Sequence, residues 1–301
     1  MVSAVVAGVD GSSESRAAVE WAAREAKMRG LPLKVVHVWE PGPEPMAQAP
    51  LLGVETQQHW SERIPREAVE GLRLRHPGIE ITMQQSSGGA ADTLVKAAED
   101  AELLALGSRG LSGIGGFMVG SVGLAVVAHA ERPVVLVRAG EQAADEHQTD
   151  PAGVPSAATP YRPVVLGLDP GGPDDSLIEF AFDAAARRSA VLRVVHGWNL
   201  PPYYTYGLSV DPEYHDEIVR QQSAALSAAL RPWRQKHPDI EVVEESRSGS
   251  GANHLVDASR EASLVVVGRR IRRSPLGAHI GSVTHAVLHH ATAPVVVVSH
   301  K

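Results

Sequence analysis

The sequence predicts an α/β protein built from two similar domains, each with an open, doubly wound sheet. First, the two halves match along their length. VVHVW (35–39) returns as VVHGW (194–198), and GSVGLAVVAHAERPVVLV (120–137) returns as GSVTHAVLHHATAPVVVV (281–298), with offsets of 159 and 161 residues. So long a period is typical of a duplicated domain and not of a solenoid repeat. Second, short apolar runs alternate with helical patterns in each half, as in βαβ units.

Five strands are expected in the first half, and several of them are apolar at every position. Such runs are typical of strands that are covered on both faces in a parallel sheet. Right-handed crossovers between them give the doubly wound arrangement. The runs span residues 5–9, 33–39, 79–85, 103–106 and 134–137.

Helices are expected between these strands. Apolar residues follow a 3, 4, 7 spacing from Val19 to Ala26, and the same spacing returns from Ile178 to Ala185. Ser12 and the residues after it are typical of a helix start. Pro65 predicts that the second helix starts or kinks there.

The domain boundaries follow from a change in composition between the two halves. The segment 139–160 is polar, has no aromatic residue and contains Pro, Ala and acidic residues, so we expect a flexible linker. The predicted domains therefore span residues 1–138 and 161–301.

Composition limits the class of protein and its partners. The net charge of −7 argues against a nucleic-acid or membrane-surface role. The chain has no cysteine, so disulfide and thiol chemistry are excluded. No apolar run is long enough to span a membrane, and the first residues do not resemble a signal peptide. We expect a cytoplasmic protein that binds neither membrane nor nucleic acid.

The glycine-rich stretch GSRGLSGIGGFMVGS (107–121) is the first candidate site. It connects a predicted strand to a helix that opens at Gly120-Ser121. In doubly wound sheets ligands bind at the carboxyl ends of the strands where the strand order reverses, so this stretch is expected to meet Asp10. Glycine allows close approach of backbone N–H groups, and a helix start attracts anions, so a phosphate is the expected guest. The alternative is a mobile loop without a ligand. Neither G-x-x-x-x-G-K-S/T nor G-x-G-x-x-G occurs at these turns, which disfavours a dinucleotide dehydrogenase.

Gly107-x2-Gly110-x9-Gly120-Ser121 resembles the nucleotide-binding pattern of the universal stress protein family, G-x2-G-x9-G-S/T. AGVDGSS (7–13), VVHVW and the closing PVVLV and PVVVV agree with it. The chain is similar to tandem universal stress proteins of the actinobacterial kind. The resemblance implies two Rossmann-like domains with five parallel strands in the order 3-2-1-4-5, helices on both faces, and binding of ATP or a related adenine nucleotide, with Mg²⁺ as a candidate companion of its phosphates.

The resemblance also assigns site residues. Asp10 would accept hydrogen bonds from ribose, Val38 would contact adenine, and the two glycine segments would hold the phosphates. Gly123 departs from the family's frequent Ser or Thr. The expected ATP-binding residues are Gly8, Val9, Asp10, Val38, Gly107, Ser108, Arg109, Gly110, Gly120, Ser121, Val122 and Gly123.

The second half departs further, so its site is expected to be weaker. Ile271 stands where the second glycine belongs, and a β-branched residue is unfavourable at positive φ. Arg269, Arg270, Arg272 and Arg273 attract phosphate or form a solvated basic loop. The equivalent residues are Gly167, Leu168, Asp169, Gly197, Gly268, Arg270, Gly281, Ser282, Val283 and Thr284.

No catalytic set and no metal site is expected. Asp10 suits a ribose acceptor better than a general base. His285 and His289 are four residues apart, but the glutamate of a metalloprotease motif is missing. His37 and His196 suit strand positions at which their hydrogen bonds are satisfied. The tyrosines at 203, 204 and 206 suit a loop, although a contact with a nucleotide or at an interface is an alternative.

Two functions from different classes stay open. One is an adenine-nucleotide-binding regulatory or stress-response protein with little turnover. The other is a slow ATPase or autophosphorylating enzyme. A third interpretation is an interaction module that binds no nucleotide.

The apolar strands at 134–137 and 295–298 would be sheet edges. They would pair with each other, in an intrachain pseudo-dimer, or across a homodimer.

Overall fold

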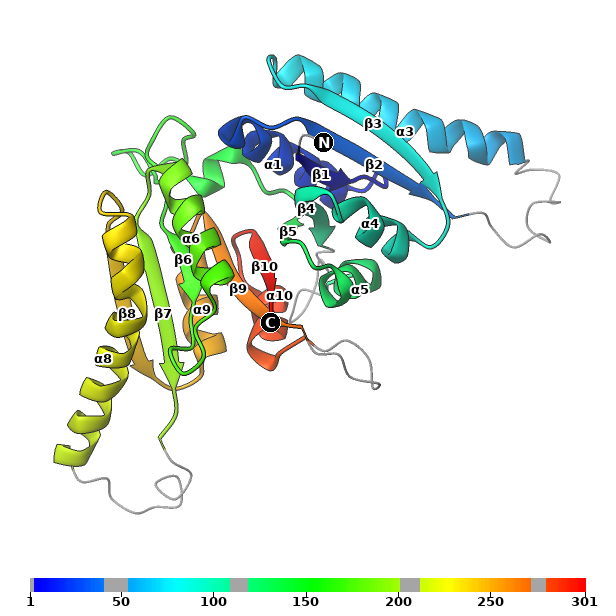
Figure 1. The fold of residues 1–301 in the computed structure, drawn as a ribbon. Coiled ribbons are helices and arrows are strands. Elements are labelled where there is room, and N and C mark those ends of the chain that lie inside the picture. Colours follow the sequence, from blue (N-terminus) through cyan, green and yellow to red (C-terminus); the bar gives the residue numbers. More distant parts are fainter. Residues whose placement is uncertain (1–2, 41–53, 109–118, 201–211, 272–279) are drawn as a thin grey trace. The chain divides into compact units, whose positions relative to one another are not determined.

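The computed structural model describes residues 3–40, 54–108, 119–200, 212–271 and 280–301; for residues 54–62 and 212 only the backbone is described. The chain divides into two compact units, Met1–Gln142 and Ala143–Lys301, which are called domain 1 and domain 2 below (Figure 1). Each is described by itself.

Domain 1 contains a parallel five-stranded sheet in the order β3-β2-β1-β4-β5. The central strand β1 pairs with β2 on one side and β4 on the other, so Val6 lies opposite Lys34 and Leu104. The predicted strand order is therefore confirmed. The strands are β1 (Ala4–Gly8), β2 (Leu33–Trp39), β3 (Ile81–Ser87), β4 (Ala101–Ser108) and β5 (Val134–Arg138).

Four helices within the described residues of domain 1 cover the two faces of this sheet. Helices α1 and α3 contact each other on one face, and α4 and α5 contact each other on the other (Figure 1). Helix α1 begins after the N-cap Ser12, as predicted. The bounds are α1 (Ser13–Arg29), α3 (Val54–Arg75), α4 (Ala90–Ala98) and α5 (Ser121–His129).

Pro65 lies inside α3, eleven residues after its first residue, so the helix does not start there, whereas the alternative of a kink at Pro65 stays a prediction. Proline removes one backbone N–H from the helical ladder. The helix continues past it because Val69 and Leu72 are buried against the sheet. Burial of an apolar face outweighs one missing hydrogen bond here.

Domain 2 repeats the architecture with the strand order β8-β7-β6-β9-β10. Its strands are β6 (Val164–Gly167), β7 (Leu192–Trp198), β8 (Val242–Ser248), β9 (Leu264–Arg270) and β10 (Val295–His300). Its helices are α6 (Asp175–Arg188), α8 (Pro212–Lys236), α9 (Gly251–Ala258) and α10 (Ser282–His290).

The first helix of domain 2 begins one turn later than its counterpart. Strand β1 ends at Gly8 and α1 is capped by Ser12, whereas β6 ends at Gly167 and α6 is capped by Asp174. The intervening residues include Gly-Gly-Pro at 171–173, which disfavours a helical turn. Helix α6 consequently has 14 residues against 17 in α1.

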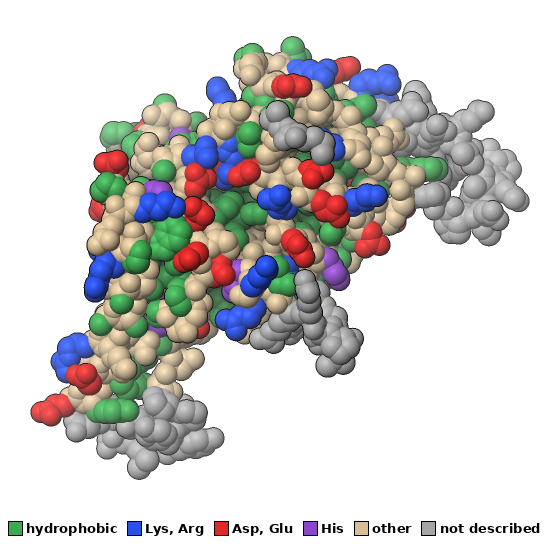
Figure 2. Space-filling view, viewed as in Figure 1, with side chains coloured by type: hydrophobic (Ala, Val, Ile, Leu, Met, Phe, Trp, Pro, Cys, Tyr) green, Lys and Arg blue, Asp and Glu red, His purple; other side chains and the backbone are tan. Residues whose placement is uncertain are grey.

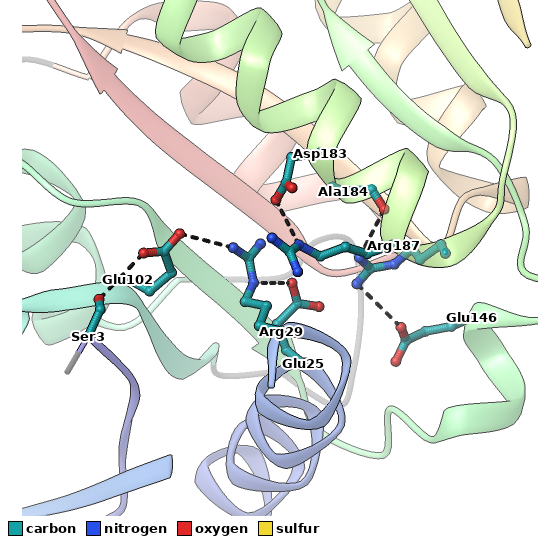
Figure 3. Close-up of polar contacts among 9 residues, drawn as sticks. Ser3, Glu25, Arg29, Glu102, Glu146, Asp183, Ala184 and Arg187 are labelled. Atoms are coloured by element: carbon teal, nitrogen blue, oxygen red, sulfur yellow. Dashed lines mark hydrogen bonds and ion pairs between the residues drawn. The ribbon is translucent and has the colours of Figure 1, made fainter. Parts of the chain in front are cut away.

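The segment predicted to be a linker, residues 139–160, has structure of its own. A 3-10 helix spans Ala143–Glu146, and His147 forms a β-bridge with Tyr161. The Glu146 side chain is 2% exposed and lies 3.8 Å from Arg188 of α6 (Figure 3). The second part of the segment is thus packed onto domain 2.

A buried ion pair also fixes the end of α1 in domain 1. Arg29 Nε donates to Glu25 at 2.7 Å, and its Nη1 lies 3.3 Å from Glu102 of β4 (Figure 3). The side chains of Arg29 and Glu25 are 2% and 1% exposed, so each charge is compensated by the other.

Charges of both signs are interspersed among the described residues of the face shown in Figure 2. None of the described helices is both long and apolar enough to cross a bilayer. Across the same residues, no group of three or more His, Asp or Glu side chains could hold a metal ion.

Candidate functional site

A cavity of about 150 Å³ lies at the carboxyl ends of β1 and β4 in domain 1. This is the point where the strand order reverses, as expected for a ligand site in a doubly wound sheet. Its floor is apolar and includes Val36, Leu94 and Leu106. Among the lining residues are Gly8, Val9, Asp10, Val38, Gly107, Gly120, Ser121, Val122 and Gly123, all expected from the sequence.

Asp10 sits in a tight hydrogen-bonded turn between β1 and α1. Its Oδ1 accepts from the Ser12 N–H at 3.0 Å and from the Ser12 hydroxyl at 2.6 Å. The Ser15 hydroxyl accepts from the Asp10 N–H at 3.3 Å. Burial acts to raise the pKa of Asp10, but the hydrogen bonds from Ser12 and Ser15 outweigh it and hold that pKa below its usual value. The carboxylate is therefore an acceptor that stays ionised.

The glycine at position 107 is required by the protein itself. An ideal Cβ there would lie 2.5 Å from the backbone carbon of Glu14 and 2.6 Å from the backbone nitrogen of Ser15. The end of β4 thus packs directly against the first turn of α1. Because this contact is within the protein, the glycine that the resemblance assigns to a nucleotide already has a structural reason.

Helix α5 begins at the edge of the same cavity. Its N-cap is Gly120, which has no side chain to accept from the N–H groups of the first turn. Ser121 is exposed, and Val122 is 38% exposed. Uncapped N–H groups together with the helix dipole favour an anion at this position.

Glu14 and Ser15 are among the lining residues that had no place in the sequence-based site. They enter because α1 starts directly at the cavity, which the helix-start signal at Ser12 could have indicated. Hydrogen bonds from the Glu14 backbone N–H and the Ser13 hydroxyl lower the pKa of Glu14. Two carboxylates, Asp10 and Glu14, therefore line a cavity that was expected to hold phosphates.

The cavity of domain 2 is larger, about 630 Å³. Because α6 begins one turn later, no helix backbone lies against Gly268. An ideal Cβ at Gly268 would instead meet the His300 imidazole at 2.8 Å and Leu177 Cδ2 at 3.1 Å. His300 Nδ1 in turn lies 3.7 Å from the carboxylate of Asp174.

The hydroxyl of Thr284, at the position of Gly123 in domain 1, has a partner within the protein. Its Oγ1 donates to the carbonyl oxygen of Gly268 at 2.7 Å. A hydroxyl has one proton to donate, so this one is not directed to a phosphate. Gly123 has no hydroxyl, so domain 1 lacks the bond that Thr284 makes to the strand in domain 2.

Ile271 is not strained. Ser189 is the one non-glycine residue with positive φ in the described part of the chain. The backbone N–H of Ile271 donates to the His300 carbonyl at 2.6 Å, which continues the pairing of β9 with β10. The backbone penalty expected for a β-branched residue here is therefore absent.

The family model for the universal stress protein family matches residues 1–138 and 160–299. The chain belongs to the universal stress protein family. Curated relatives agree along nearly the whole length. A universal stress protein of Mycolicibacterium smegmatis is 30% identical over 305 residues, covering 98% of this chain and 96% of the relative. One from Mycobacterium tuberculosis is 32% identical over 315 residues, covering 97% and 94%.

A solved structure agrees with the universal stress protein fold. The crystal structure of a universal stress protein from Archaeoglobus fulgidus has a TM-score of 0.69 at 18% identity, covering 99% of this chain and 98% of that one. This similarity supports the Rossmann-like architecture of the two domains.

The remaining expected residues of these universal stress protein domains lie in several places. Arg109 and Gly110 are outside the described residues, as are Arg272, Arg273 and the tyrosines at 203, 204 and 206. Ser108 is buried and donates to the Val137 carbonyl at 3.2 Å, away from the cavity lining. The cavity of domain 2 is lined by the expected Gly167, Leu168, Asp169, Gly197, Gly268, Arg270, Gly281, Val283 and Thr284, whereas Ser282 does not line it.

The candidate histidines also have observed positions. His37 is buried and its Nδ1–H donates to the Val9 carbonyl at 2.7 Å, and His196 makes the equivalent bond to Leu168 at 3.2 Å. Both suit the satisfied strand positions expected for them. The His285 and His289 rings lie 4.4 Å apart on α10.

Proposed function

We propose that domain 1 binds an adenine nucleotide, ATP in the first instance, and that the protein is a cytoplasmic regulatory or stress-response protein with little turnover. The observation that carries the proposal is the convergence of three elements on one cavity: an apolar floor beside Val38, the ionised Asp10, and the uncapped start of α5.

Each element suits one part of a nucleotide. An apolar cleft accepts a base, a carboxylate accepts ribose hydroxyl protons, and a helix N-terminus attracts phosphate. Asp10 and Glu14 would repel phosphates that lie close to them. A Mg²⁺ ion bound to the phosphates would reduce this repulsion, and it would be held chiefly by the nucleotide. Arg109 would supply positive charge from the glycine-rich segment.

The alternative is a slow ATPase or autophosphorylating enzyme. A general base works best when its pKa lies near the operating pH. The hydrogen bonds to Asp10 move its pKa further below that range. This favours a binding role for Asp10 over proton abstraction.

Calorimetric titration of the full chain with Mg²⁺-ATP tests the proposal, with Gly120→Val and Gly281→Val as a matched pair. Both glycines are N-caps of equivalent helices, α5 and α10. We expect Gly120→Val to abolish the tighter binding and Gly281→Val to leave it unchanged. Equal losses in the two variants, or no ATP binding by the unmodified chain, would refute the proposal. ATP turnover at several cycles per minute that Gly120→Val abolishes would establish the enzymatic alternative instead.

A further inference from the structure

The cavity of domain 2 differs from that of domain 1 at its inner end. Gly197 occupies the position of Val38, and an ideal Cβ at Gly197 would lie only 2.3 Å from the Cα of Gly251, the first residue of α9. No side chain fits at this position, so the wall that Val38 supplies in domain 1 is replaced by backbone.

Polar side chains take part in lining this end. His196 Nε2 lies 3.0 Å from Oε1 of the Gln222 side-chain amide on α8, and both residues line the cavity. His196 Nδ1 carries a proton, because it donates to the Leu168 carbonyl. In the neutral ring Nε2 is then an acceptor, and two acceptors do not bond each other, so a hydrogen bond requires the Gln222 amide to turn its N–H, in place of Oε1, toward the ring. In that orientation His196 holds the amide, whose carbonyl and second N–H are left for another partner.

The arrangement differs from that in domain 1. His37 makes the same bond to Val9, but none of the described side chains bonds its Nε2. Trp198 also lines the cavity of domain 2, and its buried indole N–H has no partner among the described residues.

A positively charged side chain also lines the cavity of domain 2. The Arg270 guanidinium lies beside Gly172 and forms no ion pair with any described residue. The nearby carboxylates are already engaged: Asp169 accepts from the Gly171 N–H at 3.0 Å, and Asp174 caps α6 and faces His300. Arg270 is therefore the cation that is available to an anionic ligand.

We propose that the cavity of domain 2 is a separate site for a nucleoside phosphate, in which Gln222, oriented by His196, determines specificity for the base and Arg270 holds the phosphate. The proposal rests on the proposed function for the class of ligand. A side-chain amide matches the edge of adenine, which presents an N–H donor beside a ring-nitrogen acceptor, through two hydrogen bonds. Domain 1 has no such group in its described lining, so the two sites are expected to rank bases differently.

The test uses AMP and ribose 5-phosphate as probes on the full chain, with Gly120→Val present in every variant to remove binding by domain 1. We expect Gln222→Ala to weaken AMP binding at least tenfold and to leave ribose 5-phosphate, which lacks the base, unchanged. Gln221→Ala is the matched control, because Gln221 is the exposed neighbour on α8 that does not line the cavity. Arg270→Gln is expected to weaken both probes by the same factor.

Three results would overturn the inference: AMP binding that Gln222→Ala leaves intact, an equal loss for the two probes in Gln222→Ala, or no AMP binding in the Gly120→Val background. A Gln222→Glu variant guards against loss of folding, because it keeps the shape of the side chain but has no N–H to donate to the base; it is expected to weaken AMP binding as well. The function proposed for domain 1 is tested separately in a Gly281→Val chain, in which the site of domain 2 is altered. If that chain does not bind ATP, the function proposed for domain 1 is wrong.

Discussion

Gly107→Ala should destabilise domain 1 even when no ligand is present. The new methyl group would lie 2.5–2.6 Å from backbone atoms of Glu14 and Ser15, whereas ordinary contacts are about 3.5 Å, so the start of α1 must move by about 1 Å. Overpacking costs about 1–3 kcal/mol. We expect the upper end, about 3 kcal/mol, because backbone cannot rotate away as a side chain can.

Hydrogen exchange followed by mass spectrometry measures this effect in each domain separately. A loss of about 3 kcal/mol accelerates globally exchanging amides of β1 and β4 by about 100-fold, since 1.4 kcal/mol corresponds to a factor of ten. Peptides of domain 2 report whether the effect is local.

Gly268→Ala is the matched control. Its methyl group meets side-chain atoms of His300 and Leu177 that can move, so we expect a loss of less than about 1 kcal/mol. Equal protection losses in the two variants would refute the reasoning. If the stability of ligand-free Gly107→Ala protein is unchanged but its ATP binding is weaker, this glycine is needed for ligand binding instead.

Three further predictions concern single residues. Gly123→Ser should stabilise domain 1 by about 0.5–1 kcal/mol, measured by thermal unfolding, because the serine hydroxyl can make the bond to the strand that Thr284 makes in domain 2. ATP affinity should stay within twofold, and a large gain in affinity would contradict this prediction. Ser12→Ala should lower the free energy of unfolding by about 1 kcal/mol, because the helix cap is lost. It should also raise the pKa of Asp10, which carbon-13 NMR of the carboxyl group measures. The depressed pKa of Asp10 means that its stabilisation is present above its usual pKa of 3.8 and is lost as the pH falls through the lower folded value, so the difference in stability between the two proteins should shrink in strong acid to the loss of the cap alone. Glu146→Gln should lower the free energy of unfolding of domain 2, because it removes the carboxylate that lies 3.8 Å from the buried Arg188 guanidinium; unchanged exchange in residues 143–162 would argue against that role.

The sequence predicts the sheet well, because the residues that indicate each strand lie within that strand. Continuous apolar runs such as Val134 to Val137 need cover on both faces, and the repeat at 159–161 residues gives the domain count. The strand order and the helix starts at Ser12 and Gly120 are confirmed.

Features that depend on tertiary contacts could not be predicted. Pro65 predicts that the second helix starts or kinks there, but α3 begins at Val54 and burial of its apolar face carries it past the proline. The glycine at 107 was assigned to a ligand, because nothing in the sequence shows that the first turn of α1 packs onto it. The residues PGGP (170–173) disfavour a helical turn, so the sequence does indicate that α6 starts late. The size of the second cavity could not be predicted, because it also depends on the position of His300.

The contact between Gly197 and Gly251 also restricts how the second domain can change over generations. Gly251 is permissive, because a Cβ there would meet Gly197 at an ordinary 3.7 Å. Gly197 is not, because any side chain meets the backbone of α9 at 2.3–2.5 Å. A valine like Val38 cannot be introduced at position 197 by one substitution, since α9 must first move away from the sheet. Backbone packing alone therefore keeps the two copies of the domain different at this position.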